Sequence, residues 1–193
     1  IGTHITGLGG ATNGFDPTGT NNPSLHTYNA QALGTSTTGF TAVTSTTATT
    51  LKAGVGYRVL IRGDRNVVLT NPSADNMNVP TTLSATGTLT TGTVTFDASS
   101  ATSPVLVNDN PTNTQTNGYT LIGNPYVSPV DWNTVTKTGV KNNAYYTWDP
   151  TLGTMAQRGR YVVYSADNGQ TNLFDDGSAL SQTNRRYLQT GQA

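Results

Sequence analysis

Two short stretches of the sequence are rich in oxygen-bearing side chains and could hold a calcium ion. Asp167-Asn-Gly169 and Asp175-Asp-Gly177 each place aspartate beside a glycine turn, and calcium takes about six to eight oxygen ligands, often from such loops. Neither stretch reproduces an EF-hand loop, and Asn168-Gly169 is also typical of a plain hairpin turn. A structural calcium is therefore an alternative to simple turns, and no other cofactor is expected. The candidate calcium ligands are Asp167, Asp175 and Asp176.

Aromatic side chains are a second kind of candidate site, because exposed rings can stack on the apolar faces of sugar rings. The candidates are Tyr126, Trp132 and Trp148. The first two lie in residues 118–132, GYTLIGNPYVSPVDW. A structural role is the simpler interpretation of this segment: a strand ends at Asn124-Pro125 because proline has no amide hydrogen. Trp132 then folds back as an apolar plug over the end of a sheet.

No arrangement of residues singles out a catalytic site. The chain has no cysteine and therefore no thiolate chemistry. Its two histidines, His4 and His26, have no partner at metal-ligand spacing, and no serine lies in a Gly-x-Ser-x-Gly elbow. Arg62-Gly-Asp64 matches an integrin-recognition tripeptide, but so short a match arises readily by chance. We predict that the chain is not an enzyme.

One covalent modification remains open at this stage. An intramolecular lysine–asparagine crosslink needs a buried lysine and an acid. Three lysines could serve in this role: Lys52, Lys137 and Lys141.

The composition predicts an all-β fold. Aspartate is the sole acidic residue type, and charged residues make up 10% of the 193 residues. Helix surfaces usually draw on glutamate and lysine, whereas the abundant threonine, asparagine and glycine favour strands and tight turns. Ten basic and ten acidic residues balance, so we expect no electrostatic attraction for nucleic acid or anionic membranes. No apolar run is long enough for membrane insertion.

Short strand-like runs separated by turn residues predict an antiparallel β-sandwich, either jelly-roll or immunoglobulin-like. Residues 93–97 alternate apolar and polar side chains, as a half-buried strand requires, and residues 89–94 are typical of a hairpin. Residues 131–135 favour a helical turn. The predicted strands are 24–30, 40–44, 57–62, 66–70, 82–89, 93–97, 104–107, 119–123, 144–148, 160–165 and 186–190.

A weak internal sequence repeat predicts that the chain consists of two similar halves. Residues 28–35 resemble residues 146–154, and residues 51–56 resemble residues 188–193. We therefore predict a first β half over residues 1–78 and a second over residues 79–193, which contains the GYTLIGNPY segment. One compact domain is the alternative.

The internal repeat also makes a prediction about the strands at the two ends of the chain. If the two halves are equivalent, we expect the first to lack a strand ahead of Ile1 and the second to lack the strand that would follow Ala193. An unpaired sheet edge is normally covered. A missing strand could come from unseen residues, from another part of the fold, or from a neighbouring molecule, as in strand addition between subunits. Ile1 and Ala193 are thus the predicted assembly termini.

Four segments carry a resemblance to a known family. Residues 118–132 resemble the GWNLIGNPYPSPIDW signature of large secreted surface proteins of Bacteroidota, which typically leave the cell by the type IX secretion system. Residues 51–59 are similar to their L-x-x-G-x-G-Y-x-V segment, and residues 145–149 resemble their YxWD strand. Residues 188–193 are similar to the first part of I-x-P-G-Q-A-F-F-V. The resemblance implies an extracellular or cell-surface β-sandwich module of a long, adhesin-type polypeptide.

These observations together predict a non-enzymatic structural or adhesive module. The first hypothesis is a self-assembling filament or surface-matrix subunit, because a neutral, threonine-rich sheet has few charges to keep strand edges apart. The alternative is a carbohydrate- or surface-binding module of a large secreted adhesin or enzyme. The expected partners are further copies of the chain, neighbouring domains of the same precursor, or a glycan.

Overall fold

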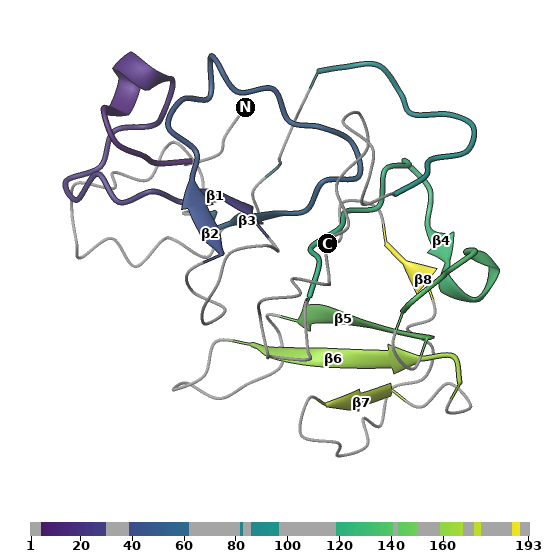
Figure 1. Cartoon of the computed structure of the whole chain (residues 1–193). Helices are drawn as coiled ribbons and strands as arrows, with labels where there is room; N and C mark the ends of the chain where they lie inside the picture. Colours follow the sequence, from purple (N-terminus) through teal and green to yellow (C-terminus); the bar gives the residue numbers. More distant parts are fainter. Residues whose placement is uncertain are drawn as a thin grey trace, which may run out of the picture. The chain divides into compact units, whose positions relative to one another are not determined.

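The computed structural model describes most of the strands predicted above (Figure 1). The described strands all pair antiparallel in small sheets, and the helices assigned within the described residues are two short 3-10 turns. The protein is therefore all-β, as the composition predicts. No helix formed by the described residues has the length and apolar character needed to cross a membrane. The described residues are 5–29, 39–61, 82, 86–96, 119–140, 143–149, 159–167, 172–174 and 187–189.

Backbone contacts divide the chain into two compact units, Ile1–Ile122 and Gly123–Ala193. The division predicted between residues 78 and 79 falls outside the described residues, and the compact units divide elsewhere. The reason is a long-range pairing within unit 1. Ile122 forms an antiparallel bridge with Val55, and the amide of Gly56 donates to the carbonyl of Leu121 at 3.4 Å. These contacts keep the chain up to Ile122 in the first unit.

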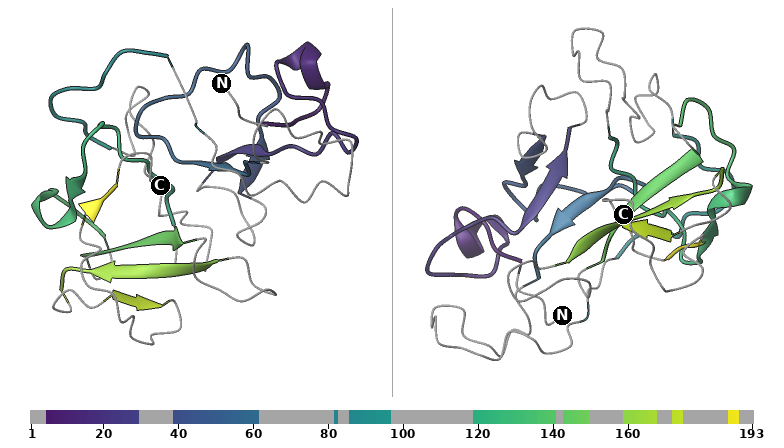
Figure 2. Two further views of the ribbon diagram at one scale, coloured as in Figure 1. Left: turned by 180° about the vertical axis from the view of Figure 1, so that it is seen from behind. Right: turned by 90° about the horizontal axis from the view of Figure 1, so that it is seen from below.

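Unit 1 is built around a three-stranded antiparallel sheet. Its strands are β1 (Leu25–Tyr28), β2 (Phe40–Ala42) and β3 (Tyr57–Val59), in the order β2-β1-β3. Thr27 of the central strand lies opposite Thr41 on one side and Tyr57 on the other. Figure 2 shows these strands from two further directions.

The core of unit 1 lies on one face of this sheet. Phe15, Leu25 and Val43 are buried together, with Ile5 and Tyr57 packed against them. Phe15 follows the 3-10 turn η1 (Gly10–Asn13), which is flanked by glycines in the left-handed region. A side chain at Gly7 would place its Cβ 2.6 Å from the Phe15 ring, so only glycine lets the chain pass over this ring.

Unit 2 contains two sheets and the second 3-10 turn. β5, β6 and β7 form one sheet in chain order, and β4 pairs with β8 in the other. Figures 1 and 2 show β5, β6 and β7 side by side. The segment 131–135 forms a helical turn, as predicted. The elements are β4 (Val130–Asp131), η2 (Trp132–Thr134), β5 (Ala144–Asp149), β6 (Arg160–Ser165), β7 (Asn172–Phe174) and β8 (Tyr187–Leu188).

Several predicted strands differ from the structure. Residues 82 and 86–96 are described and contain no strand, so the predicted strands over 82–89 and 93–97 and the hairpin over 89–94 are wrong there. A segment of alternating apolar and polar residues becomes a strand only when another strand pairs with it. No described strand pairs with residues 86–96. The predicted strand 119–123 is reduced to the single bridge at Ile122. The predictions at 66–70 and 104–107 lie outside the described residues.

Candidate functional site

The outer face of the β5–β6 pair carries a cluster of exposed aromatic side chains, here called the aromatic face: Tyr146, Trp148 and Tyr161. Successive strand residues point to opposite faces, so Tyr146 and Trp148 of β5 share one face. The antiparallel register places Tyr161 of β6 directly opposite Trp148. The three side chains retain 43%, 45% and 47% of their accessible surface, respectively. Exposed aromatic residues are thus concentrated on one side of this sheet.

Trp148 and Tyr161 form an edge-to-face pair. Their ring centroids are 5.0 Å apart and their planes meet at 74°, which is a favoured geometry for two aromatic rings. Gly159 packs against the six-membered part of the indole, and a Cβ at this position would lie 2.6 Å from it. Gly159 also has a φ of +100°, which side chains other than glycine rarely adopt. The backbone at Gly159 therefore packs against the indole and limits where the Trp148 ring of this pair can lie.

The inner face of the same strands holds the aromatic face in position. Tyr145, Val162 and Tyr164 are buried there, and the rings of Tyr145 and Tyr164 are 5.5 Å apart. The Tyr164 hydroxyl donates to Oδ1 of Asn133 at 3.0 Å, or accepts from the amide if that group is turned. Burial of these side chains stabilises the strand pair by roughly 1.5–3 kcal/mol for each large apolar residue.

Trp132 belongs to this inner core. Its side chain is 5% exposed, its indole N–H donates to the carbonyl of Asn143 at 2.8 Å, and its ring meets Tyr145 edge-on at 5.2 Å. The apolar plug is therefore the correct interpretation. The suggestion that Trp132 forms part of a sugar platform is wrong, because stacking on a sugar needs an accessible ring face.

The other predicted aromatic candidates lie in different surroundings. Tyr126 is half-buried, and its backbone amide donates to Oδ1 of Asn124 at 3.0 Å. Trp148 is the one predicted binding residue that the structure places in the aromatic face. Its partners Tyr146 and Tyr161 were missed by sequence reasoning. The alternation of side chains in residues 144–149 and 160–165 could have shown that Tyr146, Trp148 and Tyr161 share one face of the sheet. It does not say which face packs against the rest of the unit and which is exposed to solvent.

Asn124 is a second residue whose role the sequence did not reveal. Its side-chain amide donates to the carbonyls of Ser128 at 2.8 Å and of Leu188 at 3.2 Å, with Gln189 at 3.4 Å. These contacts tie the turn after Gly123 to strand β8. A turn residue beside proline is a recognisable signal, but a partner more than sixty residues away is not.

The predicted calcium ligands are only partly described. Asp167 is exposed, and its Oδ1 accepts from Nδ2 of Asn143 at 3.3 Å. Asp175 and Asp176 lie outside the described residues, as do the assembly termini Ile1 and Ala193. Within the described part of the chain, no three histidine, cysteine or acidic side chains are grouped around a common point. The calcium site and the terminal assembly sites stay predictions.

On the outer face of the unit 1 sheet lies a smaller polar and aromatic cluster. Arg58 lies over the Phe40 ring, 4.2 Å from its centroid, and Tyr28 contacts the same ring at 5.0 Å. His26 is paired in register with Arg58. Burial, followed by the charge of Arg58, lowers the pKa of His26.

The fold and the aromatic face define an all-β protein of small antiparallel sheets with an exposed aromatic surface on its second unit. Comparison with models of known families, with curated proteins and with solved structures found no match in any of the three.

Proposed function

We propose that this chain is a non-enzymatic carbohydrate-binding module that holds a glycan on the aromatic face of unit 2. The observation that carries the proposal is the edge-to-face corner of Trp148 and Tyr161, in which both rings remain nearly half exposed. Exposed apolar surface is unfavourable in water, and clusters of it commonly serve as contact surfaces. Three aromatic side chains from two adjacent strands form such a cluster here.

The geometry of the corner favours one type of glycan contact. Two coplanar rings would suit a flat, crystalline surface. Because the planes of Trp148 and Tyr161 meet at 74°, one ring offers a stacking face while the other forms a side wall. This arrangement fits one sugar ring of a single polysaccharide chain, with Tyr146 two residues along β5 as a neighbouring contact.

The wider setting of the proposal comes from the sequence. The resemblance of residues 118–132 to the surface-protein signature supports an extracellular or cell-surface location and a β-sandwich as the complete fold. In unit 2 a three-stranded sheet buries one aromatic face over Trp132 and exposes the other, which is the layout that one layer of a sandwich requires.

The test is binding to a glycan array and to insoluble polysaccharides, with the intact chain and three variants. Trp148→Ala and Tyr161→Ala are expected to lower glycan affinity at least tenfold, because each removes one wall of the corner. Tyr119→Ala removes another exposed tyrosine, in unit 1, and should leave binding unchanged. The proposal fails if no glycan binds, or if both aromatic-face variants bind as well as the intact chain while remaining folded.

Assembly of copies through strand edges is the second candidate. In the described ranges, β2 lies at one edge of the β2-β1-β3 sheet, and the chain carries no net charge to oppose association. Sedimentation and electron microscopy of the purified chain test this proposal. Filaments that persist in Trp148→Ala would support assembly as a separate property, whereas a monodisperse monomer over a wide concentration range would reject it.

A further inference from the structure

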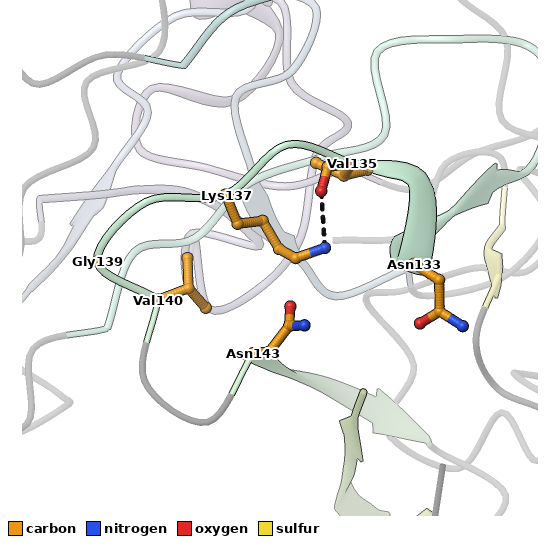
Figure 3. Close-up of a pocket in the computed structure, with 6 residues that line it drawn as sticks. All are labelled: Asn133, Val135, Lys137, Gly139, Val140 and Asn143. Carbon is orange, nitrogen blue, oxygen red and sulfur yellow. Dashed lines mark hydrogen bonds between the residues drawn. The ribbon is translucent and has the colours of Figure 1, made fainter. Parts of the chain in front are cut away.

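An open hollow next to Trp132 is lined by both a lysine and an asparagine. Six residues line this hollow, and none of them belongs to the aromatic face. Figure 3 shows the end of the Lys137 side chain directed toward the carbonyl of Val135, with the side chain of Asn143 on the same hollow. The lining residues are Asn133, Val135, Lys137, Gly139, Val140 and Asn143.

The amine of Lys137 is held by two backbone carbonyl groups. Nζ donates to the oxygens of Trp132 and Val135, and it lies 4.8 Å from the centre of the Trp132 ring. Burial lowers the pKa of Lys137 and outweighs the carboxylates of Asp131 and Asp167, which raise it. When the amine is neutral it has two hydrogens, so the two carbonyls can accept both and leave its lone pair available for attack. Such an amine is a nucleophile.

Asn143 is fixed on the other side of the hollow. Its backbone carbonyl accepts from the Trp132 indole N–H at 2.8 Å and from the backbone amide of Ala166 at 3.3 Å. Its backbone amide donates to the carbonyl of Val140 at 3.3 Å. Its φ is +47°, an uncommon conformation outside glycine. In the described part of the chain, its buried Oδ1 accepts no hydrogen bond, which is an unfavourable state for a carboxamide.

We propose that Lys137 and Asn143 join in an intramolecular amide crosslink. The lone pair of Nζ attacks Cγ of Asn143, and a new C–N bond forms. The bond from Cγ to Nδ2 then breaks, and Nδ2 leaves as ammonia after taking up the proton that Nζ loses. An amine and a primary carboxamide thus give a secondary amide and ammonia, with no change in oxidation state and no need for a cofactor.

Asp167 is placed to move the proton. Its Oδ1 accepts from Nδ2 of Asn143 at 3.3 Å, so its carboxylate contacts the group that must leave. It accepts the proton from the attacking Nζ and delivers it to Nδ2, as a general base and then a general acid. Trp132 is a positioning residue, because its indole N–H donates to the backbone carbonyl of Asn143 and its backbone carbonyl accepts from Nζ of Lys137. Holding both groups on one hollow favours reaction between two otherwise slow partners.

The product would tie the loop after η2 to the start of β5. This closes a covalent ring over residues 137–143 and leaves the aromatic face untouched. The link therefore stands independently of carbohydrate binding.

Intact mass and peptide mapping of the purified, folded chain test the crosslink. The expected mass is that of the sequence less one molecule of ammonia. After unfolding, trypsin cannot cleave at an acylated Lys137, but it still cleaves at Lys141. Residues 66–141 and residues 142–158 should then remain joined as one branched peptide. A chain at full sequence mass would overturn the proposal. So would loss of ammonia with the two peptides separate, because that result indicates cyclisation at an asparagine instead.

Matched variants assign the link to its residues. Lys137→Arg and Asn143→Ala should be at full sequence mass, whereas the neighbouring substitutions Lys141→Arg and Asn142→Ala should still lose ammonia. Asp167→Asn should slow the loss of ammonia at least tenfold after refolding, and an unchanged rate would overturn the assigned role of Asp167. The intact-mass measurement needs no variant, so misfolding of any variant leaves the proposal testable.

Discussion

The side-chain amide of Asn124 donates to the carbonyl of Leu188 across 64 positions of sequence, at 3.2 Å. Asn124 comes from the centre of the GYTLIGNPYVSPVDW segment, and Leu188 opens the segment that resembles I-x-P-G-Q-A-F-F-V. Two of the four segments that carry the family resemblance therefore meet in unit 2. The same GYTLIGNPYVSPVDW segment contacts a third of these segments in unit 1, where Leu121 packs against Gly56. In the described residues this segment therefore joins parts of the chain that are far apart in the sequence.

Replacing Asn124 should destabilise unit 2. Asn124→Ala removes the donor to Ser128 and Leu188 and the acceptor for the Tyr126 amide. We expect the free energy of unfolding to fall by about 1–3 kcal/mol, because partly buried backbone groups lose their partners. Urea unfolding measures the change. Asn22→Ala, at an exposed asparagine, should stay within about 0.5 kcal/mol, and equal effects at both sites would contradict the role of Asn124.

The two tryptophans should report opposite environments. A Trp148→Phe variant retains Trp132, which is 5% exposed, so its fluorescence should be blue-shifted and poorly quenched by acrylamide. A Trp132→Phe variant retains Trp148, which is 45% exposed, so its emission should be quenched readily and should change when a glycan binds. Similar quenching of the two variants would contradict the buried position of Trp132.

Gly159 should affect glycan binding without contacting the glycan. Gly159→Ala places a Cβ 2.6 Å from the indole of Trp148, at a φ of +100°. We expect the indole to be displaced, glycan affinity to fall about tenfold or more, and stability to fall by about 1–3 kcal/mol from backbone strain. Isothermal titration with the best ligand of the array measures affinity. Gly87→Ala meets no atom within 4 Å and serves as the control, which should bind normally.

The stability of unit 1 should fall as the solution becomes acidic. Burial and the charge of Arg58 lower the pKa of His26 below its ordinary value of 6.5. The unfolded chain therefore binds a proton at a higher pH than the folded chain does, and stability is lost as pH falls below 6.5. Hydrogen exchange of β1–β3 amides between about pH 7 and pH 5 measures this loss.

Two variants separate His26 from other titrating groups. His26→Gln should remove most of the pH dependence in this window, because glutamine does not titrate. His4→Gln keeps His26 and should behave as the original chain does. An unchanged slope in His26→Gln would assign the effect elsewhere.

The sequence located most of the described strands, and the reason is local. Turn residues and β-branched or aromatic runs mark where a strand begins and ends, and so the strands at residues 25, 40, 57, 144 and 160 were anticipated. The failure at residues 89–96 has the opposite cause. Alternation there is as clear as in β5, but a strand also needs a partner, and that partner depends on distant residues.

The sequence by itself determined that this protein is all-β, with little charge and short strands, because composition and turn chemistry act within a few residues. Only the tertiary structure decided that Trp132 is buried while Trp148 is exposed, that Asn124 bonds to Leu188, and that Lys137 and Asn143 line one hollow. Strand periodicity separates side chains into two faces, but packing against the rest of the unit selects the face that water reaches. The candidate sites depend on that selection.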